Sequence, residues 1–313
     1  MTHKTEILIV GATGQQGSAT IKALVEATQQ QSAPGPRILA LTRSASSEKA
    51  QALARRHPEH VALVEGDAAA APQAIFAVHP AISSLFLVTA PPGDEAQAIP
   101  LIDAAVEHGV RLIVFSSVDR GGNARSWDSP TSIPHFAAKH RIELHLRDAT
   151  ACAASAPGGA TTTSWTILRP TGFMENYAPG AFGRMMAGLW ATMPPDRAMQ
   201  LVSVRDIGRF AARALLDPGA WAGRAVGLAG DELTFAEAED VFRRIAGHGM
   251  PRLWTPLGRG VRWLVDDAGK SMDWFERVGF GVDIEALRRK DEQVQDFESW
   301  LRTSSGWVAD RNV

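Results

Sequence analysis

The feature that most constrains the fold lies near the N-terminus, where four aliphatic residues at 7–10 meet glycines at 11, 14 and 17. A continuous aliphatic run is typical of a strand buried on both faces of a parallel sheet. A helical pattern of apolar residues begins soon after Gly17. Glycine allows a sharp turn at Gly11, contact between backbone and phosphate at Gly14, and close helix packing at Gly17. This order of strand, glycines and helix predicts dinucleotide binding at the helix N-terminus.

Predicted strands and helices alternate through the first half of the chain. Aliphatic runs predict further strands at 37–43, 61–65, 84–89, 111–117 and 165–170, with helices at 48–57, 94–109 and 134–152. Asp94 is expected to cap the second of these helices. Repeated strand–helix units of this length imply right-handed crossovers, and therefore an α/β fold with a doubly wound parallel sheet of the Rossmann type.

We expect two domains along the chain. A Rossmann domain that binds NADP is predicted over residues 1–155, and a smaller mixed C-terminal lobe for the substrate over 156–313. Strands of this lobe, one of them near 225–229, are expected to rejoin the sheet. The stretch 119–133 is rich in Gly, Asn and Asp and is expected to be a long loop with a functional role or high mobility.

Composition excludes several classes of partner. The chain is 45% hydrophobic and 21% charged with a formal net charge of −2, so neither a nucleic-acid surface nor a membrane surface is expected. No apolar run reaches the roughly 18 residues of a membrane span, and the first residues are too polar for a signal peptide. The single cysteine, Cys152, suits a reducing compartment, which favours a cytoplasmic protein. No cluster of Cys and His resembles a metal site.

The end of the second predicted strand bears on the choice of dinucleotide. An NAD site of this type normally has an acidic residue there, but the chain has Thr42 and Arg43. An arginine fork matches a 2′-phosphate, which favours NADP(H) over NAD(H); the alternative is a solvated loop residue. Asp67 closes the third strand, where it either reaches the adenine or caps the next helix.

Polar and turn residues follow the fourth and fifth predicted strands. In open α/β sheets, ligands bind at the carboxyl ends of the strands. Thr89, Ala90 and Pro91 are therefore expected to border the ribose on the nicotinamide side. Ser116 ends the fifth strand and is expected to face the same crevice, where it either orients the substrate or simply stabilises a turn.

The chain resembles the NmrA-like family, an atypical branch of the short-chain dehydrogenases/reductases. The matching pieces occur in the family's order over about residues 6–301. They are Gly-Ala-Thr-Gly-Gln-Gln-Gly at 11–17, Thr-Arg at 42–43, Ile-Val-Phe-Ser-Ser-Val at 113–118, Pro-His-Phe-Ala-Ala-Lys at 134–139, Trp-Thr-Ile-Leu-Arg-Pro at 165–170, Phe-Met-Glu-Asn at 173–176, Val-Arg-Asp-Ile-Gly at 204–208 and Ser-Trp-Leu at 299–301.

This resemblance implies a set of cofactor-binding residues and three candidate catalytic residues. In short-chain reductases a Tyr four positions before a Lys donates the proton, but here His135 precedes Lys139. Lys139 is expected to hold the nicotinamide ribose or to pair with Glu143, and His135 either replaces the missing acid or is structural. Tyr177, the only tyrosine, either offers a hydroxyl or packs. The expected cofactor residues are Gly11, Thr13, Gly14, Gln15, Gln16, Gly17, Thr42, Arg43, Asp67, Thr89, Ala90, Pro91, Ser116, Lys139, Pro170 and Phe173.

Three functions are compatible with this pattern. The first is an NADP(H)-dependent reductase of a small apolar or aromatic carbonyl, quinone or imine, with orientation in a dry pocket supplying most of the rate. The second is a sensor that binds NADP(H) and regulates a protein partner without turnover, which the missing Tyr favours. The third is a non-redox enzyme, for example one that closes a ring, built on the same cofactor pocket.

Overall fold

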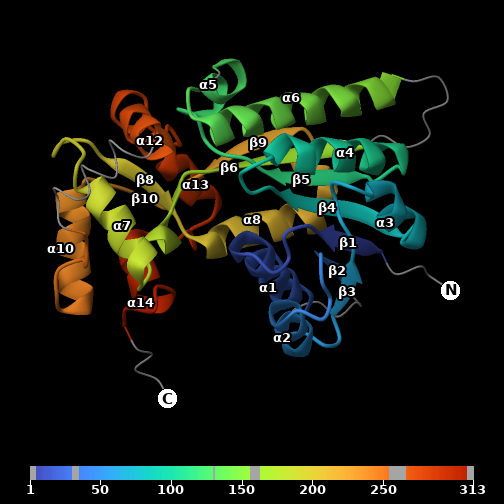
Figure 1. The fold of residues 1–313 in the computed structure, drawn as a ribbon, viewed down its shortest axis with the longest axis horizontal. Helices are drawn as coiled ribbons and strands as arrows, with labels where there is room; N and C mark the ends of the chain where they lie inside the picture. Colours follow the sequence, from blue (N-terminus) through green and yellow to red (C-terminus); the bar gives the residue numbers. More distant parts are fainter. Residues whose placement is uncertain (1–4, 30–34, 130, 156–162, 254–265, 309–313) are drawn as a thin grey trace. The chain divides into compact units, whose positions relative to one another are not determined.

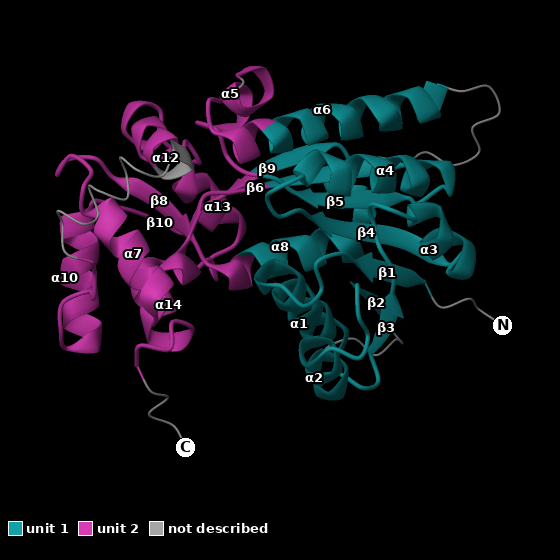
Figure 2. Ribbon diagram, in the orientation of Figure 1, with its two compact units in different colours: residues 1–117, 138–168, 207–226 teal, residues 118–137, 169–206, 227–313 magenta. Residues whose placement is uncertain are grey.

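The computed structural model describes residues 5–29, 35–129, 131–155, 163–253 and 266–308. The chain divides into two compact units, shown in Figure 2. Unit 1 comprises residues 1–117, 138–168 and 207–226, and unit 2 comprises residues 118–137, 169–206 and 227–313. Each unit is assembled from three segments, so neither corresponds to one continuous stretch such as 1–155.

Unit 1 is organised around a seven-stranded sheet with the order β3-β2-β1-β4-β5-β6-β9. Neighbouring strands from β3 to β6 run parallel. The strand order runs outward from β1 in both directions, as in a doubly wound sheet, and this confirms the predicted fold class. The strands are β1 (Glu6–Ile9), β2 (Arg37–Thr42), β3 (Val61–Glu65), β4 (Ile82–Val88), β5 (Leu112–Ser116), β6 (Ser164–Pro170) and β9 (Arg224–Leu228).

Helices cover both faces of this sheet (Figure 1). Helices α1 and α8 share one face, and a Cβ on Gly208 of α8 would lie only 2.5 Å from the backbone of Ala19 in α1. On the other face, Arg141 of α6 forms an ion pair with Glu95 of α4. The helices are α1 (Gln15–Gln29), α2 (Glu48–Arg56), α3 (Pro72–Val78), α4 (Asp94–Glu107), α6 (Pro134–Ser155), α8 (Val204–Leu216) and α9 (Pro218–Trp221).

The central strands supply the core of unit 1. Leu8 and Ile9 of β1, Leu39 of β2 and Leu85 of β4 are wholly buried. Burial of each such side chain contributes about 1.5–3 kcal/mol, which explains why the aliphatic runs without alternation become central strands. The Rossmann-type core is therefore specified by the same residues that identify its strands in the sequence.

Unit 2 contains a three-stranded sheet and a core rich in aromatic residues and methionine. Strand β8 (Met199–Val202) pairs in parallel with β7 (Gly172–Phe173) and antiparallel with β10 (Asp231–Leu233). Trp190, Trp300 and Phe242 are fully buried in its core. The remaining elements are α5 (Asn123–Asp128), the 3-10 helix η1 (Met174–Tyr177), α7 (Ala181–Trp190), α10 (Phe235–Ala246), α12 (Asp266–Arg277), α13 (Ile284–Lys290) and α14 (Phe297–Thr303).

Two local predictions are wrong. The stretch 119–133 is not one loop, because it contains helix α5. The buried Asp119 carboxylate accepts hydrogen bonds from the backbone of Gly121 and Gly122 and so organises the turn before this helix. Asp94 does not cap α4, because Gly93 holds the N-cap position and Asp94 is the first helical residue. Its carboxylate is buried and accepts a hydrogen bond from Thr89 instead.

Other predicted elements match the structure to within three residues at each end. Strand 61–65 has the predicted limits, and the strand expected at 84–89 is Ile82–Val88. Strand β9, predicted near 225–229, does join the large sheet, whereas β7, β8 and β10 form a sheet of their own. Among the helices of the described residues, none combines the length and apolar character needed to cross a bilayer.

Candidate functional site

The loop between β1 and α1 is an open cradle of backbone. Gly11 has a positive φ of 71°, and the Gly14 N–H donates to the Gly11 carbonyl oxygen at 2.9 Å. A Cβ on Gly17 would lie 2.2 Å from that same oxygen, so a side chain there cannot fit. Thr13, Gly14 and Gln15 are exposed around the start of α1. The helix N-terminus is therefore surrounded by exposed residues of this loop.

This cradle fits a pyrophosphate. The first turn of α1 holds no acidic side chain, so nothing opposes the partial positive charge of the helix N-terminus. Backbone N–H groups at such a terminus bind phosphate oxygens directly. Contact between the residues at 11–17 and a pyrophosphate stays a prediction.

The loop after β2 is held in place by a carboxylate that the sequence analysis did not identify. The Ala45 N–H donates to Glu65 Oε2 at 2.8 Å, and the Gln51 side chain donates to the Ala45 carbonyl oxygen at 2.8 Å. Arg43 is exposed in this loop. Thr42 and Glu65 are register partners in β2 and β3, so the predicted strand pairing is the signal that would have revealed Glu65.

Asp67 stabilises the turn after β3. Its Oδ1 accepts from the N–H groups of Ala69 and Ala70 at 2.8 and 3.1 Å. These two bonds, together with the nearby Arg43 charge, lower the pKa of Asp67. Helix α3 begins later, at Pro72 with Ala71 as N-cap, so Asp67 is not its cap. Contact between Asp67 and an adenine stays a prediction.

Lys139 lies at the carboxyl ends of β4 and β5, almost fully buried. Its Nζ donates to Thr89 Oγ1 at 3.1 Å and to the Ser116 carbonyl oxygen at 3.2 Å. Thr89 Oγ1 in turn donates to Asp94 Oδ1 at 2.5 Å, and that oxygen is 3.8 Å from Lys139 Nζ. The Lys139 charge is therefore satisfied by a compact network in which Asp94 supplies the counter-charge. Thr89 and Lys139 were each predicted from the sequence as site residues, whereas Asp94 was not predicted as their partner.

Other residues predicted around the strand ends also lie in unit 1. Ser116 Oγ donates to Gln16 Oε1 at 2.5 Å, which joins the end of β5 to the first turn of α1. Ala90 and Pro91 are exposed after β4, and the Gln97 side chain donates to the Ala90 carbonyl oxygen at 2.8 Å. Within the described residues, no group of three or more His, Cys, Asp or Glu is arranged to hold a metal ion.

The other candidate residues belong to unit 2. His135 is half-buried in the first turn of α6, four residues before Lys139, with its ring 4.7 Å from the Phe136 ring. Pro170 is buried at the end of β6, and Phe173 is half-buried at the end of β7. Whether these residues contact a cofactor stays a prediction.

Tyr177 is packed into the core of unit 2. It is 3% exposed, and its hydroxyl contacts Met199 Sδ at 3.7 Å while its ring packs on Trp190. Burial raises the pKa of Tyr177 well above its usual value. A buried phenol held this way favours the packing alternative over proton donation.

Glu175 connects three of the sequence pieces that carry the family resemblance. Its Oε2 accepts from the N–H of Val204 at 3.0 Å, and its Oε1 accepts from Trp300 Nε1 at 3.1 Å. The pieces at 173–176, 204–208 and 299–301 therefore meet at one half-buried carboxylate. Burial raises the pKa of Glu175. Glu175, in the piece at 173–176, therefore has a structural role that the sequence alone does not reveal.

Comparison with known proteins supports the same fold. The model of the NmrA-like family matches residues 3–261. The negative transcriptional regulator NmrA in complex with NAD is 16% identical over 97% of this chain and 96% of its own, with a TM-score of 0.69. The NADPH-dependent quinone oxidoreductase of Escherichia coli is 21% identical over 95% and 98%, with a TM-score of 0.69. The Citrobacter sp. triphenylmethane reductase is 18% identical over 95% and 98%, with a TM-score of 0.68.

At these identities the solved structures demonstrate a shared fold, while the family match extends over most of the sequence. The cradle at 11–17, the doubly wound sheet and the ordered series of sequence pieces all agree with that match. The chain belongs to the NmrA-like family, with the NAD(P)-binding fold of an atypical short-chain dehydrogenase/reductase.

Proposed function

We propose that this protein is an NADP(H)-dependent reductase of a small apolar or aromatic carbonyl, quinone or imine. The observation that carries the proposal is Lys139, a buried cation built into the carboxyl ends of β4 and β5 by Thr89 and Asp94. Ligands of doubly wound sheets bind at these ends. Two similar structures, the quinone oxidoreductase and the triphenylmethane reductase, were solved with NADPH and NADP(H) and are themselves reductases.

Different residues of unit 1 bind different parts of the cofactor. The backbone at 11–17 binds the pyrophosphate, and the exposed Arg43 guanidinium binds the 2′-phosphate as a charge-assisted fork. Lys139 binds the nicotinamide ribose, with its ammonium group held in one orientation by Thr89 and the Ser116 carbonyl oxygen. When bound, NADPH supplies a hydride.

Proton supply is assigned to His135 or to water. An imidazole titrates near neutral pH and can donate a proton, and His135 is half-buried in the first turn of α6. Tyr177 is left out of this role because its hydroxyl contacts Met199 in the apolar core. With no strong acid assigned, the rate would depend mainly on orientation of the two reactants.

The same observation on Tyr177 favours a second candidate function. A protein that binds NADP(H) without turnover needs no proton donor, and the similar NmrA structure is that of a negative transcriptional regulator. In that case the protein would report the NADPH-to-NADP⁺ ratio to a protein partner.

Two measurements separate these functions. Calorimetry with NADPH, NADP⁺, NADH and NAD⁺ tests cofactor binding itself. NADPH oxidation in the presence of a panel of quinones, aldehydes and imines then tests turnover. Binding with substrate-dependent oxidation supports the reductase, and binding without oxidation across the panel supports the sensor. Unchanged turnover in His135→Phe would exclude that imidazole as the proton donor.

A further inference from the structure

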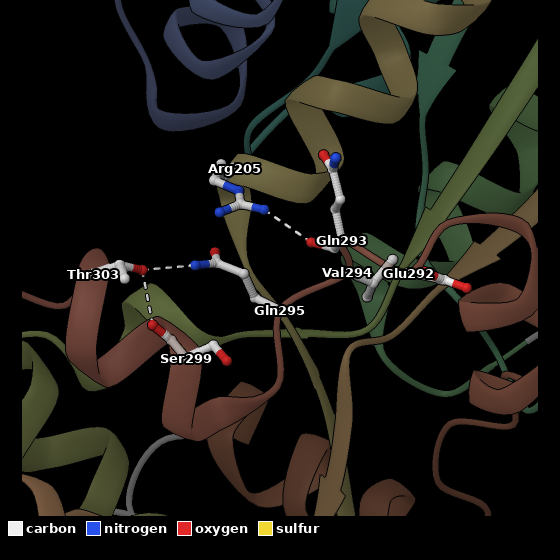
Figure 3. Close-up of a pocket in the computed structure, with 7 residues that line it drawn as sticks. All are labelled: Arg205, Glu292, Gln293, Val294, Gln295, Ser299 and Thr303. Carbon is white, nitrogen blue, oxygen red and sulfur yellow. Dashed lines mark hydrogen bonds between the residues drawn. The ribbon is translucent and has the colours of Figure 1, made fainter.

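Unit 2 contains an open pocket of about 440 Å³ that the proposed function does not use. It lies where the start of α8 meets the loop before α14, and its lining is mostly polar (Figure 3). The lining includes Arg205, Gln295, Ser299 and Thr303. Sites for small metabolites range from roughly 300 to 1,000 Å³, so the volume suits a ligand of that class.

Gln295 presents a hydrogen-bond acceptor that has no donor. The residue is 4% exposed, and its backbone N–H donates to Asp206 Oδ2 at 2.7 Å. Its side-chain Nε2 donates to Thr303 Oγ1 at 2.8 Å, which fixes the amide plane. Within the described residues, Oε1 is buried and accepts no hydrogen bond. A buried acceptor without a donor is unfavourable, so a ligand that donates a hydrogen bond to this oxygen would satisfy it.

Arg205 presents a positive charge close to this acceptor. Its Nη2 donates to the Gln293 carbonyl oxygen at 2.9 Å, and its Nε lies 3.4 Å from Asp206 Oδ1. These contacts hold the guanidinium in place and use only part of its five donors. The side chain is 41% exposed. Figure 3 shows Gln295 Oε1 on the side of Arg205, and the Glu292 carboxylate directed away from it.

We propose that this pocket binds a small hydroxycarboxylate. The carboxylate would accept charge-assisted hydrogen bonds from Arg205, and the neighbouring hydroxyl would donate to Gln295 Oε1. A plain carboxylate satisfies only the guanidinium. An amino acid could also donate to Gln295, but its ammonium group would lie beside the guanidinium charge, and the repulsion disfavours it. Binding of the hydroxycarboxylate at this site does not depend on the cofactor or on the proposed reductase activity.

The test compares two ligands that differ by one hydroxyl. Calorimetry or ligand-observed NMR on the full chain would measure L-malate against succinate, with inorganic phosphate as a third ligand. We expect malate to bind with a Kd of about 1 mM and succinate to bind about fivefold more weakly, the ratio that one net hydrogen bond supplies. Tighter binding of phosphate than of malate would overturn the ligand class.

Three variants assign the contacts, with thermal melting to confirm that each is folded. Arg205→Gln should weaken binding of both carboxylates at least about tenfold, because a charge-assisted contact is lost. Gln295→Met removes the acceptor, so the affinity for malate should fall to that for succinate while succinate is unaffected. Glu285→Gln, at an exposed acidic residue of α13 outside the lining, is the matched control, and its affinity for malate should be unchanged.

Several outcomes would overturn the proposal. One is equal affinity of the wild type for malate and succinate, and another is no binding of either up to about 10 mM, ten times the expected Kd. Unchanged discrimination in Gln295→Met would also overturn it, and this variant keeps the test valid if Arg205→Gln fails to fold.

Discussion

The charged ammonium group of Lys139 is almost fully buried. The ammonium is held there by two oxygen acceptors and by the Asp94 carboxylate, which is itself 3% exposed. A buried ion pair contributes little relative to an apolar pair of the same size, yet removal of one partner leaves the other charge uncompensated. The stability of the fold therefore depends on both members of this pair being present.

The first prediction concerns Asp94→Asn. This change keeps an oxygen for Thr89 but removes the counter-charge of Lys139, so the free energy of unfolding should fall by about 3 kcal/mol. The double variant Asp94→Asn with Lys139→Met removes both charges and should be more stable than Asp94→Asn alone. Urea denaturation of the wild type, both single variants and the double variant measures this coupling. Simple addition of the two single effects would show that the two side chains do not interact.

The second prediction concerns Arg43→Ala. Loss of a charge-assisted contact to the 2′-phosphate should weaken NADPH binding by roughly 10- to 100-fold, corresponding to about 1.5–3 kcal/mol. NADH lacks that phosphate, so its affinity should not change. Arg55→Ala, an exposed arginine on α2, is the matched control for net charge. Equal weakening of NADPH and NADH by Arg43→Ala would contradict a contact with the 2′-phosphate.

At the scale of elements, the turn from β1 into α1 must fit the fold and must also leave room for the cofactor, and different glycines meet these two requirements. Gly17 makes room for the fold, because its Cβ would overlap the Gly11 carbonyl oxygen at 2.2 Å. Gly14 is less constrained, since its Cβ would lie 3.2 Å from the same oxygen, and the residue is exposed. Substitution at the two positions should therefore separate folding from cofactor binding.

The third prediction is this separation. Gly17→Ala should lower the free energy of unfolding by at least about 2 kcal/mol, because backbone must move to admit the methyl group. Gly14→Ala should change stability by less than about 1 kcal/mol but weaken NADPH binding at least about tenfold, because the methyl group occupies the phosphate cradle. Thermal denaturation and calorimetry measure the two effects. Full NADPH affinity in a folded Gly14→Ala protein would argue against a phosphate at this loop.

The elements that the sequence predicts well are those whose pattern is repeated over many residues. Strands such as Val61–Glu65 are recognisable because burial on both faces demands an uninterrupted aliphatic run. Helix α5 was missed because six polar and mixed residues show no apolar period, and its turn depends on the buried Asp119. Asp94 and Glu65 were missed as partners of the site for a related reason. Their contacts depend on the path of a loop and on strand register, which are set by tertiary structure.

At the scale of the whole molecule, Glu175 connects segments that are far apart in the sequence. It is half-buried, and it accepts hydrogen bonds from the start of α8 and from Trp300 of α14. Burial raises its pKa above the ordinary value of 4.5, despite the opposing effect of these bonds, and the nearby Asp206 carboxylate raises it further. The folded state therefore binds this proton more tightly than the unfolded chain does.

The fourth prediction is the pH dependence that follows. A carboxyl group with a raised folded-state pKa contributes stability that is fully present below pH 4.5 and is lost as pH rises through the folded-state pKa. The variant Glu175→Gln has no titrating group at this position, and its amide N–H₂ faces a donor N–H. The substitution should therefore lower the free energy of unfolding by about 1–3 kcal/mol at pH 5. Because only the wild type loses stability as this group ionises, the difference between the two proteins should be smaller at pH 8.

The matched control for this titration is Glu298→Gln on α14. Hydrogen bonds from Arg244 and Arg302 lower the pKa of Glu298, so its contribution to stability has the opposite pH dependence and is lost as pH falls through its folded-state value. The cost of Glu298→Gln should therefore stay constant between pH 5 and pH 8. Urea denaturation of the three proteins at both pH values measures the comparison. If the cost of Glu175→Gln grew with pH, Glu175 would be an ionised carboxylate stabilised by its two N–H donors. The lowering of its pKa by these hydrogen bonds would then exceed the raising of its pKa by burial.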